Sequence, residues 1–324
     1  MDPFMEQAEA LDSKEAWPPL PLADWRETRD AVHLWTQVVG KIRLRLTPPI
    51  NHWWHSTLYV TPSGLTTSSI PWREGAFEIR FDFLQSLLRI EASSGRSAQV
   101  QLRAGCVADF QAELFDALRA LEIAPTIRGI PDEMEDRTPF SADWRNRPYD
   151  AEAARRFHRA LLSAHRVLEE FRGRFLGKAS PVHFFWGSFD LAATRFSGRR
   201  APPRPNADRI TQVAYSHECH SAGFWPGGGV APDAAFYAYA SPEPEGIALE
   251  PLEPNAATYD PKAHEFLLPY DAVRTQRSPR HALLRFFQTT YEAGASLANW
   301  DRDRLELRGE PFLGGEDETR VPPS

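Results

Sequence analysis

The stretch "AFEIRFDF", Ala76 to Phe83, alternates between apolar and polar side chains. Phe77, Ile79 and Phe81 are separated by single charged residues. Side chains of a β-strand point alternately to its two faces, so this pattern predicts a strand with one apolar and one solvated face. A sheet with only one covered face is typical of antiparallel proteins.

Neighbouring segments extend the same pattern. Residues 41–47, "KIRLRLT", also alternate and predict a strand. Residues 55–70 indicate two strands around a Pro-Ser-Gly turn, and residues 87–104 indicate a second hairpin. Together these segments predict an antiparallel meander of five or six strands.

Helices are predicted before and after this meander in the sequence. Apolar residues recur at helical spacing for about four turns from Asp24, and again from Val107 to Leu121. The apolar stripe of the second helix predicts that it covers the buried face of the sheet.

A second set of elements follows residues 124–149, which hold four prolines and an acidic cluster and so predict a linker or wrapping segment. A long helix is expected from Asp150 to about Phe175, followed by strands at 181–196 and 234–240. A final amphipathic helix is expected at 280–300. We therefore predict an α+β fold with antiparallel sheets covered by helices.

The two sets resemble each other, since each runs from a helix ending in Gly-Lys, past a proline and a histidine among aromatics, to a strand closing on Ser-Gly. This favours a duplicated unit, although chance similarity between two α+β halves is an alternative. The expected organisation is a disordered tail or expression scar at 1–16, an N-terminal half at 17–123, the proline-rich linker at 124–149, a C-terminal half at 150–304 and a disordered tail at 305–324.

Composition excludes several classes of protein. The formal net charge of -7 argues against nucleic-acid binding, and no apolar run is long enough for a membrane helix. Cys106 and Cys219 offer no disulfide framework, so a cytoplasmic location is expected. The composition of the chain, with 10 tryptophans, is that of a globular protein with an aromatic core or aromatic-walled cavities.

Histidines offer the first candidate chemistry. His217 and His220 in "SHECHSAGFWPGGG" are three residues apart, and the glycines that follow predict a loop, where such a pair could bind a divalent metal with Glu218. The alternative is a pair of histidines that only form local hydrogen bonds. His52 and His55 lead into a predicted strand, so one is expected to point inward and the other outward.

The segment "HFFWGSFDLAATRF" predicts charged side chains within a buried strand. A regular strand would place His183 and Arg195 on one face and Trp186 and Asp190 on the other, unless Gly187 introduces a bulge. A buried Asp190 needs a partner, and Arg195 or a histidine is expected in that role. The pair would be either a structural salt bridge or a charged group at the floor of a pocket.

Several long words, among them "NHWWHSTLYVTPSGLTTSSIPW", "FLGKASPVHFFWGSFDLAATRFSGR" and "YSHECHSAGFWPGGG", resemble the bacterial family of domain of unknown function 5996. The resemblance covers Trp17 to about Arg304. It implies a soluble bacterial protein and carries over no activity. The family pattern retains Ser216, His217 and Glu218 but does not require Cys219 or His220, which leaves His217 and Glu218 as the pair of interest.

We predict a site between the halves, where ionisable groups converge among tryptophans. The predicted catalytic residues are His217, Glu218, His183 and Asp190, and the predicted ligand-binding residues are His52, Trp54, Trp186, Arg195 and Trp225. The leading hypothesis is an enzyme that uses a histidine and a carboxylate on a small polar molecule, with or without a divalent metal. The alternatives are a binding protein for an aromatic or cationic small molecule and a scaffold that binds proteins through its proline-rich loops.

Overall fold

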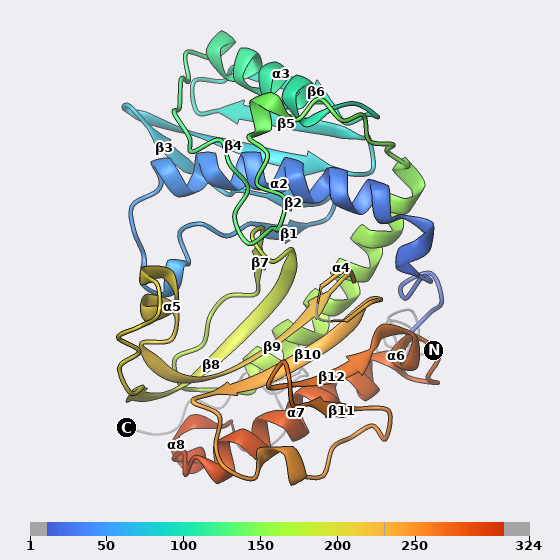
Figure 1. Cartoon of the computed structure of the whole chain (residues 1–324), viewed down its shortest axis with the longest axis vertical. Helices are drawn as coiled ribbons and strands as arrows, with labels where there is room; N and C mark the ends of the chain where they lie inside the picture. The colour runs from blue at the N-terminus through green and yellow to red at the C-terminus, as the bar shows by residue number, and fades with distance from the viewer. Residues whose placement is uncertain (1–11, 230, 308–324) are drawn as a thin grey trace, which may run out of the picture.

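The computed structural model describes residues 12–229 and 231–307, which form two α+β halves stacked along the long axis of the molecule (Figure 1). Each half runs from a long helix through an antiparallel sheet to a second helix. The predicted fold class is therefore confirmed.

The first half contains helix α2 and a six-stranded sheet, followed by helix α3. Its elements are η1 (Leu22–Asp24), α2 (Arg26–Leu46), η2 (Asn51–Trp53), β1 (Tyr59–Thr61), β2 (Gly64–Thr66), β3 (Ile70–Trp72), β4 (Gly75–Asp82), β5 (Leu87–Ala92), β6 (Ser97–Gln101) and α3 (Val107–Ala120). The strand order is β1-β2-β4-β5-β6, with β3 paired to β4. Both predicted hairpins are present.

The alternating side chains of β4 form one buried and one solvated face, as predicted. Phe77, Ile79 and Phe81 are buried in the core, and α2 and α3 contact this sheet at β3 and β6. The opposite face of β4 carries charged side chains. On that face Arg80 pairs with Glu91 across the strands. One face of this sheet is thus covered and the other is solvated.

The prediction of a strand at residues 41–47 is wrong, because α2 continues to Leu46. Val38, Val39 and Ile42 are fully buried at helical spacing, and Lys, Arg and Leu are good helix formers. A short alternating segment also fits a helix whose long basic side chains extend past the apolar surface. Packing of this helix therefore overrides the local alternation.

Residues 124–149 form an irregular segment with one short turn of helix, η3 (Phe140–Ala142). The segment packs back on the first half: Phe140 is fully buried, and Gly105 and Arg147 exchange two backbone hydrogen bonds of 2.9 and 3.1 Å. This segment wraps the first half and reaches the junction between the halves.

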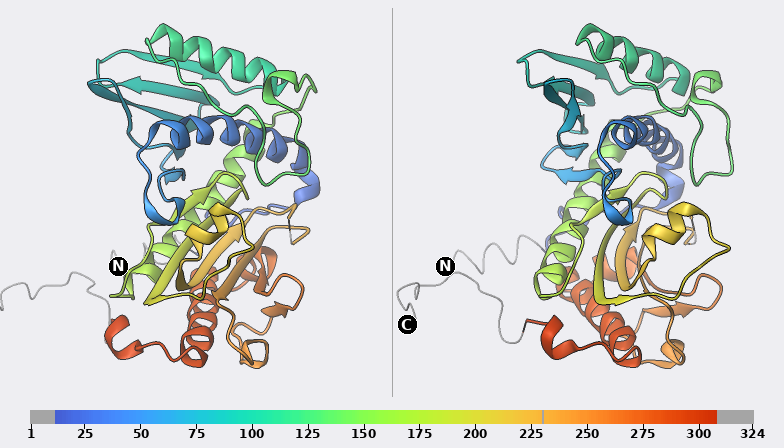
Figure 2. Two further views of the ribbon diagram at one scale, coloured as in Figure 1. Left: turned by 60° about the vertical axis from the view of Figure 1, so that its left-hand side comes forward. Right: turned by 90° about the vertical axis from the view of Figure 1, so that its left-hand side faces the viewer.

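The second half repeats the plan on a larger scale. Its elements are α4 (Ala151–Gly173), β7 (His183–Phe185), β8 (Asp190–Arg200), α5 (Arg209–Ala214), β9 (His217–Trp225), β10 (Ala235–Ser241), η4 (Ile247–Leu249), β11 (Thr258–Asp260), β12 (Glu265–Pro269), α6 (Tyr270–Arg274), α7 (Pro279–Leu297) and α8 (Arg302–Leu305). The strand order is β11-β12-β10-β9-β8-β7. Helices α4 and α7 cover one face, and α5 lies on the other side of the sheet (Figure 2, right).

The two sheets meet through their first strands. Leu58, immediately before β1, and Phe184 of β7 exchange two backbone hydrogen bonds of 2.9 Å in an antiparallel bridge. Equivalent strands that pair antiparallel are related by a local two-fold axis, so this junction and the two six-stranded sheets fit a duplicated unit. Helix α4 also contacts β1 and therefore links the halves (Figure 2).

The expected tails lie mostly outside the described residues, at 1–11 and 308–324. Of the described part, Asp12 accepts hydrogen bonds from Ser278 Oγ (2.6 Å) and from the backbone of Arg280 (2.9 Å). Glu306 forms a bridge with Phe175. None of the helices in residues 12–307 combines the length and the apolar character that a membrane crossing requires.

Candidate functional site

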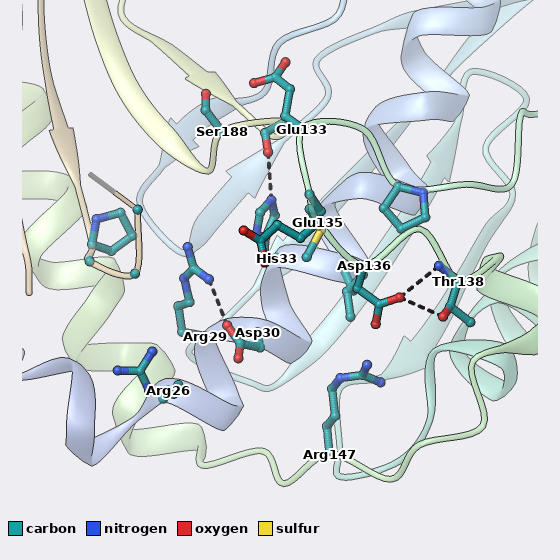
Figure 3. A pocket seen from close by; sticks show the side chains of 18 of the residues that line it. Arg26, Arg29, Asp30, His33, Glu133, Glu135, Asp136, Thr138, Arg147 and Ser188 are labelled. Atoms are coloured by element: carbon teal, nitrogen blue, oxygen red, sulfur yellow. Dashed lines mark hydrogen bonds and ion pairs between the residues drawn. The ribbon is translucent and has the colours of Figure 1, made fainter. Parts of the chain in front are cut away.

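A cavity of about 730 Å³ opens between the two halves (Figure 3). Its walls come from the first turns of α2, from residues 131–147, from the turn between β7 and β8, and from residues 225–229. Neither half encloses the cavity alone, because the wrapping segment and α2 face two turns of the second sheet. The volume is in the range that encloses a small molecule.

Arginines from α2 supply positive charge. Arg26 is exposed and has no hydrogen bond or ion pair within the described part of the chain. Arg29 binds Asp30 with an N···O distance of 2.8 Å, and its guanidinium lies 5.4 Å from the centre of the Phe189 ring. A Cβ on Gly228, whose φ is +82°, would lie 3.2 Å from that guanidinium. A glycine here thus allows the backbone to approach Arg29 closely.

Carboxylates from the wrapping segment supply negative charge. Glu133 and Glu135 line the cavity, and among residues 12–229 and 231–307 neither side chain has an ion-pair partner. Figure 3 shows Glu133 beside Ser188, and Glu135 between the α2 arginines and the side formed by Thr138 and Arg147. Desolvation and then repulsion from Asp190 raise the pKa of Glu133.

His33 is the histidine of the cavity wall. Its Nε2 donates to the carbonyl oxygens of Trp186 (3.1 Å) and Gly187 (2.9 Å), which places the ring proton on Nε2. Burial and then the charge of Arg29 lower its pKa to about 4, so the ring is neutral at pH 7. Its Nδ1 is buried without a partner.

A buried carboxyl lies directly behind the cavity wall. Ser188, which lines the cavity, donates to one oxygen of Asp190, and the Tyr237 hydroxyl donates to the other. Burial raises the pKa of Asp190 to about 6. Trp225 also lines the cavity and stacks on Tyr237 with ring centres 4.3 Å apart. The predicted partners of Asp190, Arg195 or a histidine, are wrong; the serine and tyrosine hydroxyls satisfy it.

Four of the predicted residues lie together at a different place. The ring of His52 is 5.2 Å from Trp54 and 5.7 Å from His217, and Trp54 is 5.6 Å from His183. His52 and His55 are both buried, so the predicted inward and outward pair is wrong. The cause is a tight turn with positive φ at His52 and Trp53, which breaks strand alternation.

The remaining predicted residues are separated. Glu218 accepts from Ser197 (2.9 Å) and Arg199 (2.8 Å), away from the cavity. Trp186 donates to the Ser56 carbonyl over 2.6 Å, and Arg195 is 1% exposed with its guanidinium 3.5 Å from the centre of the Phe171 ring. Of the nine predicted site residues, only Trp225 lines the cavity.

The segment around His217 is strand β9 rather than the predicted loop. His217 and His220 therefore point to opposite faces, and His220 is fully buried with both ring nitrogens unpartnered. The ladder with β8 and β10 fixes this geometry and overrides the glycines downstream. Across the described ranges no three His, Cys, Asp or Glu side chains are grouped to hold a metal ion.

The cavity residues Arg26, Arg29, His33, Glu133 and Glu135 were not predicted as a site. The sequence does show the acidic cluster "PDEMED" (131–136), but in a proline-rich segment such a cluster predicts only a linker or wrapping segment. The basic residues of α2 are part of an ordinary amphipathic helix pattern. No local signal connects these two segments, which are about a hundred residues apart in the chain.

Fold and cavity define an α+β protein with two antiparallel sheets and a charged cavity at their junction. The chain belongs to the family described as a family of unknown function (DUF5996), whose model matches residues 17–307. Comparison with curated proteins and with solved structures found no match.

Proposed function

We propose that the cavity between the halves binds a small zwitterionic molecule and that Glu133 exchanges a proton with it. The observation that supports this is the presence of unpaired charge of both signs in one cavity: Arg26 on α2, and Glu133 and Glu135 on the wrapping segment. If these charges were structural, they would be expected to pair with each other. Their separation instead suits a ligand with an anionic and a cationic group.

The arginine side would take the anionic group. Guanidinium groups bind carboxylates through paired N–H donors, and Arg29 is already oriented by Asp30 and Phe189. The cationic group would lie against Glu133 and Glu135. Trp225 offers a flat apolar wall between them.

Glu133 is the group best suited to acid/base chemistry. Desolvation and then repulsion from Asp190 raise its pKa, which makes it a stronger proton acceptor than an ordinary carboxylate. The cavity thus combines a histidine and a carboxylate, His33 and Glu133, in place of the predicted His217 and Glu218. Because His33 is neutral, its contribution is to hold the Trp186–Gly187 turn beside the cavity.

The proposal extends to location. Both cysteines, Cys106 and Cys219, are buried free thiols, which suits the reducing cytoplasm of a bacterium.

The binding test uses free amino acids as zwitterionic probes, each beside its amide and its N-acetyl form, which lack one of the two charges. We expect an amino acid to raise the melting temperature of the protein and both singly charged forms to fail. Arg26→Gln should abolish the effect, while Arg45→Gln, an exposed arginine on the same helix, should leave it unchanged. Equal shifts from charged and singly charged forms would contradict the proposal.

Proton transfer is tested separately with Glu133→Gln. In D₂O, wild-type protein should exchange a carbon-bound proton of the bound probe for deuterium, as measured by NMR, and the variant should not. Glu74→Gln, an exposed glutamate in a turn, is the control. Binding without exchange would reject the catalytic part and leave the alternative of a non-catalytic binding protein.

A further inference from the structure

A second cluster of ionisable groups lies away from the cavity, at the base of residues 201–216. We call it the basic cluster; it consists of His52, Lys178, His217 and Arg200. The ammonium of Lys178 lies 2.8 Å from His52 Nε2, and the rings of His52 and His217 are 5.7 Å apart. Arg200 pairs with His217 in the ladder between β8 and β9.

His52 has a defined role in this arrangement. Its Nδ1 lies 3.0 Å from the carbonyl oxygen of Ala214, an acceptor, so Nδ1 carries the proton and donates it. Nε2 therefore presents a lone pair to Lys178. The ring is 5% exposed and is fixed between Trp54 and Phe196, so it holds the lysine in place.

Among residues 12–229 and 231–307, no carboxylate forms an ion pair with Lys178, His217 or Arg200. Lys178 has no ion-pair partner within residues 12–229 and 231–307, and its other neighbours are the rings of Trp54 (5.2 Å) and Phe196 (4.8 Å). Glu218, next to His217 in sequence, is bound to Arg199 instead. Burial and the charges of Lys178 and Arg200 lower the pKa of His217, and burial lowers the pKa of Lys178.

The cluster is open on one side. Lys178 and Arg200 are exposed and His217 is half-buried, whereas Trp54, Phe196 and His52 form the wall behind them. Two cations, Lys178 and Arg200, and the imidazole of His217 thus lie on three separate segments around one surface position. Two cations that are not paired with a carboxylate of the described residues raise the local positive potential, which favours an anion at this position.

We propose that the basic cluster binds a phosphoryl group, as inorganic phosphate or as a phosphate monoester. Lys178, His217 and Arg200 would donate to its oxygens, and His52 would position Lys178. Donors on three segments suit a tetrahedral dianion better than a planar carboxylate, which one guanidinium can bind through paired hydrogen bonds. Trp54 would lie against the organic part of a monoester.

This proposal does not depend on the proposed function of the cavity between the halves, because none of the four residues lines that cavity. Failure of the amino-acid probes would leave it intact.

The experiment titrates inorganic phosphate into the full chain and follows heat and the histidine ring resonances. We expect saturable binding, with the pKa of His217 raised by the bound anion. Lys178→Met should weaken binding at least tenfold, and Lys262→Met, at an exposed lysine in the turn between β11 and β12, should leave it unchanged. Absence of saturable binding to wild-type protein, or equal affinity in both variants, would overturn the proposal.

Two further measurements keep the result interpretable. If Lys178→Met does not fold, His217→Gln, a change at a half-buried ring, should weaken phosphate binding instead, and unchanged affinity there would count against the site. Methyl phosphate distinguishes the sources of the ligand: tighter binding than inorganic phosphate indicates a monoester, whereas weaker binding indicates the free ion.

Discussion

Two carboxyl groups of the second sheet, those of Asp190 and Glu265, differ in their hydrogen-bond partners. Asp190 is buried but accepts from two hydroxyls, whereas one oxygen of Glu265 is buried without a partner. Burial, and then the charges of Asp190 and Asp260, raise the pKa of Glu265 from its ordinary value of 4.5 to about 8. An unsatisfied carboxyl of this kind makes stability depend on pH.

Replacement of Glu265 tests this dependence. Between pH 4.5 and 8 the folded protein keeps a proton on Glu265 that the unfolded chain has released, so the free energy of unfolding falls as pH rises through this window. Glu265→Gln should remove this loss and stabilise the protein at pH 8.5 by on the order of 1 kcal/mol, because the site is partly exposed. Urea unfolding at pH 5 and pH 8.5 measures the difference.

The control is Glu245→Gln, at an exposed glutamate before η4. It should keep the wild-type difference between the two pH values. An identical pH dependence in Glu265→Gln and wild type would show that Glu265 does not hold a proton in the folded state.

At the scale of elements, α2 is the helix that connects the first half to the cavity. It crosses the turn after β7 at Gly40, where a Cβ would overlap the indole of Trp186. That indole cannot move freely, since its Nε1 donates to Ser56 and Lys41 lies 5.4 Å from the ring centre. The helix can therefore approach Trp186 this closely only because residue 40 is a glycine without a side chain.

Gly40→Ala should destabilise the protein by about 2 kcal/mol, since the overpacking cost exceeds the gain in helix propensity of about 1 kcal/mol. Gly173→Ala is the matched change at the end of α4, where a Cβ would meet no atom within 4 Å. That variant should be neutral or slightly more stable. Chemical unfolding of both variants gives the comparison, and equal stability of the two variants would contradict the predicted overpacking at Gly40.

At the scale of the whole molecule, the two halves share one core. Phe157 of α4 packs on Trp25 of the first half with ring centres 5.1 Å apart and on Phe83 at 6.3 Å. The same ring stacks on Phe189 of the second half at 5.4 Å. Together with the bridge between Leu58 and Phe184, these contacts tie both sheets to α4.

We therefore expect one cooperative unfolding transition. Tryptophan fluorescence and far-ultraviolet circular dichroism should give coincident curves, because tryptophans of both halves lose their environment when α4 unfolds. Two separated transitions would show that the halves are independent domains. The boundary at the proline-rich segment would then mark a true linker.

The amino-acid sequence by itself determined the periodic elements. The alternation in β4, the two hairpins, α3, α4 and the final helix are all visible because their periods reflect burial on one face. The same reasoning failed at residues 41–47, where alternation was too short to distinguish strand from helix. It failed again at β9, where turn residues downstream concealed a strand.

Only the tertiary structure decided which side chains meet. The cavity joins α2, the wrapping segment and two turns of the second sheet, and the basic cluster joins residues 52, 178, 200 and 217. Periodicity reports how each residue relates to its own element, but contacts between distant segments depend on how those elements pack. His217 and Glu218 illustrate the point: they are adjacent in sequence, and the sheet separates them because neighbouring residues of a strand face opposite ways.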